Sequence, residues 1–120
     1  MPAKPQTPSA KIMSESNPIR TIRDADDRTI SWRRMSVLDQ ARMMRAVGAE
    51  YSNNTAFMTI AMIACMVVEI DGVPSLTPKT LPQIDAAIER LGDKGYNAVS
   101  DDLVIMVAES EGNVEQDVKN

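Results

Sequence analysis

One run of fourteen uncharged residues constrains the fold of this chain more than any other feature. It extends from Thr55 to Val68 and contains only apolar side chains and threonine. The run is shorter than the roughly 20 residues that a helix needs to cross a bilayer. A helix that is apolar on every side is buried inside a protein. The sequence therefore predicts a central, buried helix over 55–68 in a protein of the cytoplasm.

The segment before this run predicts a β-hairpin over 19–35. Ile, Thr and Trp favour strands, and the aspartates at 24, 26 and 27 favour a turn between them. Ile30 and Trp32 alternate with Ser31 and Arg33, so they share one face of a strand. A lone hairpin is only marginally stable. We therefore expect Trp32 to be buried against the helices that follow.

Capping patterns predict three further helices, over 36–48, 81–91 and 94–110. Ser36 and Thr80 each precede an Asp or Gln by three residues, which is the capping-box spacing. Gly92 separates the last two helices. Between the helices, Glu69–Pro74 predicts a short extended piece with a turn at Asp71-Gly72. The expected fold class is α+β and mainly α, with an N-terminal hairpin packed on about four helices.

Composition divides the chain into three parts. Residues 1–18 are rich in proline and serine and predict a disordered tail, because they cannot bury enough apolar surface to offset ordering. Residues 19–112 predict a single domain, and 113–120 predict a frayed acidic tail.

The residue inventory argues against most catalytic chemistry. The chain has no histidine and one cysteine, Cys65, which excludes Ser-His-Asp triads, Cys-His pairs and zinc sites built from these residues. The aspartates at 24–27 lack the spacing of a calcium loop. Asp101 and Asp102 diverge by about 100° on a helix, so we expect both to be solvated. We predict no catalytic residue, metal ligand or cofactor.

Charge is distributed unevenly along the chain. Residues 1–45 carry nine Lys or Arg against five Asp or Glu, and residues 46–120 carry four against twelve. Opposite charges at the two ends favour association of copies with one another. Arg33 and Arg34 are the residues that we expect to take part in this self-association.

The arginines also suggest a nucleic-acid-binding alternative. Seven of them, placed in the hairpin and the first helix, could contact phosphates: Arg20, Arg23, Arg28, Arg33, Arg34, Arg42 and Arg45. The sequence isoelectric point near 4.8 and the 3% aromatic content argue against it. A carboxylate-based enzyme is a further alternative.

Methionine is unusually frequent, with nine in 120 residues. Met adapts its shape to varied apolar partners. Met58, Met62 and Met66 recur at helical spacing and predict a partner-binding groove, with Met43 and Met44 as further contacts. The branched residues Ile60, Ile63 and Val67 are assigned to the core. The alternative is that the methionines themselves fill the core.

Several segments, in this order and spacing, resemble the small tail assembly chaperones of long-tailed bacteriophages, prophages and gene transfer agents. The segments are Ile22–Ile30, Arg33–Asp39, Ala64–Pro74 and Gln83–Leu91. The resemblance covers about 85 residues, from Ile19 to Leu103.

The resemblance implies a non-enzymatic assembly factor in the bacterial host cytoplasm. Its partner would be the helical tape-measure protein, kept soluble while the tail tube assembles around it. The resemblance also makes the major tail protein a candidate partner and is compatible with self-association. It implies no membrane contact, and nucleic acid is not expected as a partner.

Overall fold

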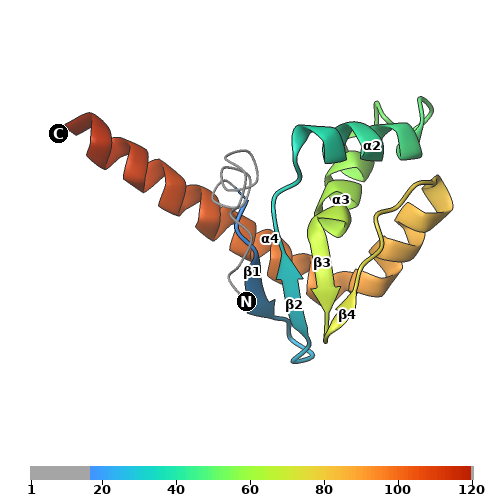
Figure 1. The fold of residues 1–120 in the computed structure, drawn as a ribbon, viewed down its shortest axis with the longest axis horizontal. Coiled ribbons are helices and arrows are strands. Elements are labelled where there is room, and N and C mark those ends of the chain that lie inside the picture. The colour runs from blue at the N-terminus through green and yellow to red at the C-terminus, as the bar shows by residue number, and fades with distance from the viewer. Residues whose placement is uncertain (1–16, 120) are drawn as a thin grey trace, which may run out of the picture.

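A computed structural model of the chain describes residues 17–119, and the side chains of 17–111. Most of the predicted N-terminal tail, and the side chains of the predicted C-terminal tail, therefore lie outside the described residues. The element order is β1 Arg20–Arg23, β2 Thr29–Trp32, α2 Val37–Val47, α3 Thr55–Met66, β3 Val67–Ile70, β4 Val73–Pro74 and α4 Leu81–Lys119 (Figure 1). The predicted α+β, mainly α class is confirmed.

The strands form one antiparallel sheet in the order β1-β2-β3-β4. The predicted hairpin pairs Ile22 with Ile30, and β2 then pairs with β3 through Ile30 and Ile70. The turn between β3 and β4 has positive φ at Asp71 (49°) and Gly72 (81°), which is the backbone of a type I′ hairpin turn. The Glu69–Pro74 piece is thus a second hairpin in the same sheet, a pairing that local patterns did not predict.

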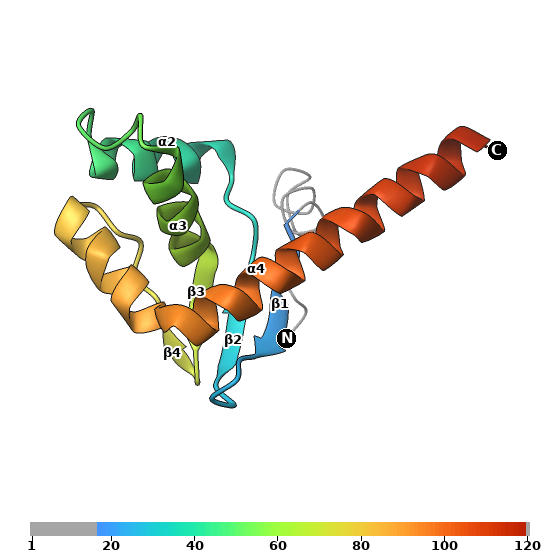
Figure 2. The same cartoon turned by 180° about the vertical axis from the view of Figure 1, so that it is seen from behind.

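One face of this sheet is covered by α4, which crosses behind the strands (Figures 1 and 2). Ile30 and Trp32 on that face are fully buried, in a cluster with Ile63, Leu91 and Val99. The predicted burial of Trp32 is therefore confirmed. On the other face the hydroxyls of Thr21 and Ser31 hydrogen bond at 3.1 Å in an exposed position.

The predicted helices at 81–91 and 94–110 join into α4, which bends at Gly92 (φ 70°, ψ 176°). Arg28, from the turn of the first hairpin, donates to the carbonyls of Arg90 (2.9 Å) and Leu91 at this bend. These are carbonyls that a helix end leaves without partners. Beyond the bend α4 continues to Lys119 rather than ending near 110.

The predicted helix over 55–68 ends earlier than expected, whereas α2 agrees closely with its predicted bounds of 36–48. Helix α3 ends at Met66, because Val67–Ile70 pairs with β2 instead of continuing the helix. The predicted cap at Ser36 is present on α2, and Gly48 caps the other end of the helix. Helix α2 buries Met43 and Val47, and its outer side carries Val37 and Met44, which are 83% and 51% exposed.

Candidate functional site

An open groove of about 870 Å³ lies in the described part of the chain. Its walls are the start of α2, the end of α3 with β3, the segment 74–80, and the first half of α4. The apolar side chains that line it come from all four: Met35, Met43, Ala64, Cys65, Met66, Val67, Val68, Ile70, Pro74, Leu76, Pro78, Ala86, Ala87 and Leu91. A groove of this size and apolar lining suits a ligand or a partner side-chain cluster.

The wall formed by residues 74–80 is held in place by Arg90. Its guanidinium donates to Ser75 Oγ at 2.8 Å and to the carbonyl of Val73 at 2.7 Å. The start of α4 is fixed by Thr80, whose Oγ1 accepts from the backbone N–H of Gln83. Gln83 in turn accepts from the N–H of Lys79 at 2.7 Å. Leu76 sits on this wall with 90% of its surface exposed, so an apolar side chain faces solvent beside the groove.

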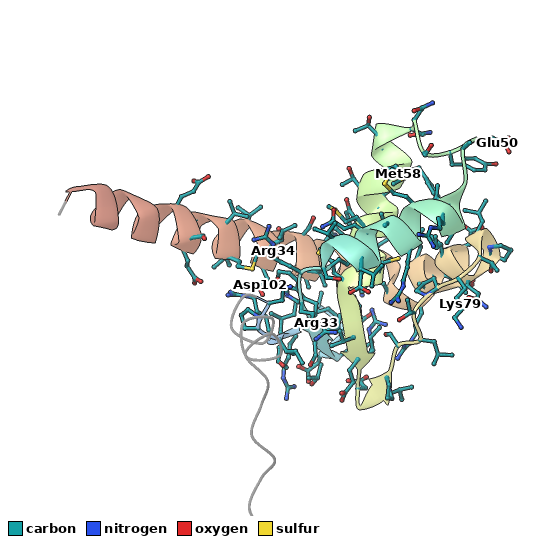
Figure 3. All side chains as sticks on the ribbon, turned by 45° about the horizontal axis from the view of Figure 1, so that its top comes forward. Arg33, Arg34, Glu50, Met58, Lys79 and Asp102 are labelled. Carbon is teal, nitrogen blue, oxygen red and sulfur yellow. The ribbon has the colours of Figure 1, made fainter. Side chains whose placement is uncertain are left out.

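The groove carries a positive charge. Arg33, Arg34, Lys79 and Arg90 line it, against a single acid, Asp39. Asp39 lies 3.8 Å from Arg42. Within residues 17–111, none of the four cations forms a salt bridge. Figure 3 labels Arg33 and Arg34 on the segment between β2 and α2, and Lys79 beside the start of α4. An occupant with acidic groups would therefore meet uncompensated positive charge.

Cys65 contributes its half-buried side chain to the groove wall. Burial raises the pKa of this thiol to about 11, because the apolar surroundings disfavour the thiolate. A thiol is a poor nucleophile in its protonated form. Cys65 therefore acts as a small apolar wall residue at neutral pH.

The predicted methionine stripe, formed by Met58, Met62 and Met66, divides between the groove and the core. Met66 lines the groove but is only 4% exposed and belongs to the main core cluster. Met58 and Met62 are half-buried against a second cluster built on Met43, Val47, Ala61 and Ile84. Met44 lies outside the groove and is 51% exposed. Ile60, which the sequence assigned to the core, is 37% exposed.

The stripe is therefore corrected in two ways. Met58 and Met62 do not line the groove, because the α2–α3 interface takes up their side chains. Met43 and Met66 do line it, together with Met35. Arg33 and Arg34, predicted for a separate self-association surface, line this same groove. The groove residues Leu76 and Lys79 were missed because segment 75–80 has no periodic pattern, and Arg90 was missed because its role depends on contacts with Val73 and Ser75.

Asp102 is buried, which corrects the expectation that it is solvated, whereas Asp101 is exposed. Arg20 donates to both carboxylate oxygens of Asp102, at 2.7 and 3.0 Å, and Trp32 Nε1 donates to Oδ2 at 2.9 Å. The hydrogen bond from Arg20 is the main cause that lowers the pKa of Asp102 below its ordinary value, against the opposing effect of burial. This carboxylate joins β1, β2 and α4.

Asp24 organises the turn of the first hairpin. Its side chain is buried, which raises its pKa, but hydrogen bonds from the backbone and guanidinium of Arg28 outweigh burial and lower the pKa overall. Asp24 Oδ1 accepts the N–H of Asp26 and of Arg28, both at 2.9 Å. The aspartates at 24–27 thus form a turn, and they are paired: Asp27 with Arg23 at 2.8 Å and Asp26 with Lys94 at 2.6 Å.

The seven arginines of the nucleic-acid alternative do not form one free surface. Arg20, Arg23 and Arg28 are paired with Asp102, Asp27 and Asp24. Arg33 and Arg34 line the groove, while Arg42 and Arg45 lie on α2. A phosphate backbone laid across the hairpin would have to compete with these carboxylates.

The described residues contain neither a candidate metal site nor a candidate membrane-spanning helix. No group of three or more Asp, Glu or Cys side chains in that part of the chain is placed to hold a metal ion. None of the described helices combines the length and apolar character that a membrane crossing requires.

Comparisons with protein-family models, with curated proteins and with solved structures each yield no match. Function is therefore inferred from the groove and from the order of the sequence motifs.

Proposed function

We propose that this chain is a tail assembly chaperone of a long-tailed phage or prophage, and that its groove binds a helical segment of the tape-measure protein. The observation that carries the proposal is the groove itself: an apolar, methionine-containing hollow of about 870 Å³ with four cations on its walls. The sequence resemblance from Ile19 to Leu103 supplies the class of partner.

The groove suits an amphipathic helix in two respects. Its floor of Met35, Met43 and Met66 adapts to apolar side chains of varied shape, and such grooves commonly accept one face of a helix. Arg33 and Arg34 on one wall and Lys79 on another would pair with acidic residues that flank the apolar face of the partner. Rim charges of this kind mainly increase the rate of association and fix orientation. A long helical protein could be kept soluble by many copies bound along its length.

Gene neighbourhood and co-expression give the first test. A chaperone gene should lie between the genes for the tail tube and the tape-measure protein. Co-expression with that tape-measure protein should move it from the insoluble to the soluble fraction, and the two chains should then co-purify. A tape-measure protein that stays insoluble, with no co-purification, would contradict the proposal.

A second test measures one-to-one binding of fluorescent peptides from the helical part of the tape-measure protein. Leu76→Gln should raise the dissociation constant about tenfold or more, because a leucine covered on binding contributes about 1.5 kcal/mol or more. Lys79→Glu should weaken the same peptides most at low salt. Ile19→Gln, at an exposed apolar residue away from the groove, is the matched control and should leave binding unchanged.

A nucleic-acid-binding function would give a different pattern. Short DNA or RNA would then bind with an affinity that falls steeply with salt. Leu76→Gln would have no effect on that binding.

A further inference from the structure

The second half of α4 carries an apolar surface that the chain itself leaves uncovered. Residues 103–108 read Leu-Val-Ile-Met-Val-Ala, so the helix is apolar all round in this stretch. Leu103 and Met106 pack against the main core. Val104, Ile105 and Val107 point away from it and are 69%, 51% and 43% exposed. A helix with this pattern is normally covered on both sides.

This uncovered surface, which we call the α4 face, comprises Val104, Ile105, Val107 and Ala108. Its charges are all acidic: residues 101–111 include two aspartates and two glutamates and no Lys or Arg. Asp101 and Glu111 lie on the exposed side of the helix with the α4 face, and Glu109 is 3.4 Å from Arg20. Figures 1 and 2 both show this end of α4 projecting away from the remainder of the fold.

A complementary surface lies on the outer side of α2. Val37, Leu38 and Met44 are 83%, 53% and 51% exposed there, and Ala41 lies between them. Arg42 and Arg45 are exposed on the same helix. This α2 face is apolar and basic where the α4 face is apolar and acidic. The α4 face extends over roughly one and a half helical turns and the α2 face over about two, so one can lie along the other.

We infer that the α4 face of one copy docks on the α2 face of a second copy. Apolar contact between the two helices would provide the affinity, and Asp101 and Glu111 would lie near Arg42 and Arg45 to fix the orientation. Pairing of two α4 faces is disfavoured, because it would bring the acidic residues of both copies together. In Figure 1 the second half of α4 projects away from α2, so the contact joins one copy to the next.

A contact between two different surfaces closes as a dimer where each copy gives its α4 face to the α2 face of the other. Where the two contacts are not reciprocal, it generates a ring or an open chain of copies. The groove takes no part in it, because the α4 face and the residues Val37, Leu38 and Met44 are absent from the groove walls. The inference therefore does not rest on the proposed function, and either can fail alone.

The test is sedimentation velocity of the full chain over a wide range of concentration. The wild-type chain should form species that grow with concentration. Val104→Gln/Ile105→Gln should stay monomeric, and so should Leu38→Gln/Met44→Gln, with dissociation constants raised at least about tenfold. All four side chains are exposed in the single copy. Circular dichroism and the melting temperature should therefore match the wild type. Leu76→Gln, on the groove wall, is the matched control and should self-associate normally.

Mixing the two double variants decides between the possible pairings. Each retains one intact face, so an equimolar mixture should form a one-to-one complex that grows no further. A wild-type chain that is monomeric throughout would overturn the inference. So would a Leu38→Gln/Met44→Gln variant that self-associates like the wild type, which is the result expected if α4 pairs with α4. A mixture that forms no complex would overturn it as well.

Discussion

Trp32 and Asp102, seventy positions apart, meet in a buried hydrogen bond of 2.9 Å from the indole nitrogen to the carboxylate. Arg20 approaches the same carboxylate from the edge strand. Three elements that are distant in the sequence therefore share one charged group. A buried carboxylate is tolerated only where donors replace its water. Here a guanidinium and an indole do so.

Asp102→Asn should destabilise the protein by roughly 3 kcal/mol at neutral pH, because it removes one charge of a part-buried pair and leaves Arg20 with only the exposed Glu109 at 3.4 Å. Urea unfolding followed by tryptophan fluorescence measures this directly, since Trp32 is the only tryptophan. Asp101→Asn is the matched control at the exposed neighbouring position and should change stability by less than about 0.5 kcal/mol. Equal effects of the two substitutions would mean that the carboxylate of Asp102 is not specifically paired.

The same carboxylate predicts the direction of the pH dependence. The pKa values of Asp102 and Asp24 are lowered in the folded chain, chiefly by Arg20 for Asp102 and by Arg28 against burial for Asp24. Their contribution to stability is complete above the ordinary aspartate pKa of about 4 and is lost as the pH falls through the lowered values. The wild type should thus lose stability below about pH 4. Asp102→Asn should lose less over that range, and parallel acid curves would contradict the assignment.

Gly95→Ala should destabilise the chain, although alanine stabilises a helix by about 1 kcal/mol relative to glycine. A methyl group at Gly95 would lie 2.7 Å from Leu91 Cδ1 and 2.9 Å from Arg28 Nη2. Arg28 would have to withdraw from the bend of α4, where it caps the carbonyls of Arg90 and Leu91. We expect a loss of roughly 1–3 kcal/mol in thermal or urea unfolding. A gain in stability would show that the arginine adjusts without cost.

Met62→Asp and Met44→Asp separate the two environments of the methionines on α2 and α3. Met62 packs against the cluster of Met43, Val47 and Ala61, so a carboxylate there should cost about 2–4 kcal/mol. Met44 is half-exposed on the outer side of α2, so Met44→Asp should lower the free energy of unfolding by less than about 1 kcal/mol. Equal, small effects in urea unfolding would restore Met62 as a partner-facing residue.

Local signals in the sequence predicted much of the fold. The caps at Ser36 and Thr80, the turn at Asp71-Gly72 and the break at Gly92 depend only on neighbouring residues, and each is present. The alternation of Ile30 and Trp32 predicted their buried face in the same way. Such features need no knowledge of what lies opposite.

Pairings between distant residues were not predictable in this way. Val67–Ile70 contains three branched apolar residues, so it suits the end of a helix or a strand, and its pairing with β2 makes it a strand. Asp102 resembles Asp101 in sequence, and only the arrival of Arg20 and Trp32 makes it a buried group. The groove likewise depends on segment 74–80 folding back beside α3, and Arg90 holds that segment through a side chain without a recognisable motif.

Cys65 provides a chemical probe of the groove. Its pKa of about 11 implies that the thiolate fraction at pH 8 is roughly a hundredfold below that of a thiol with a pKa of 9. Labelling of the native chain with a thiol reagent at pH 8 should therefore be at least about tenfold slower than labelling in urea. The native rate should keep rising with pH to about 11, as more thiolate forms.

Because Cys65 lies on the groove wall, an occupant of the groove should slow its labelling further. A tape-measure peptide at saturating concentration should protect the thiol in the wild-type chain and much less in Leu76→Gln at the same peptide concentration. Self-association through the α4 and α2 faces should leave the rate unchanged, since neither face is part of the groove wall that carries Cys65. Measuring the rate at low and high protein concentration, with and without peptide, therefore separates the two interfaces in one experiment. Protection that depends on protein concentration alone would place the contact between copies in the groove instead.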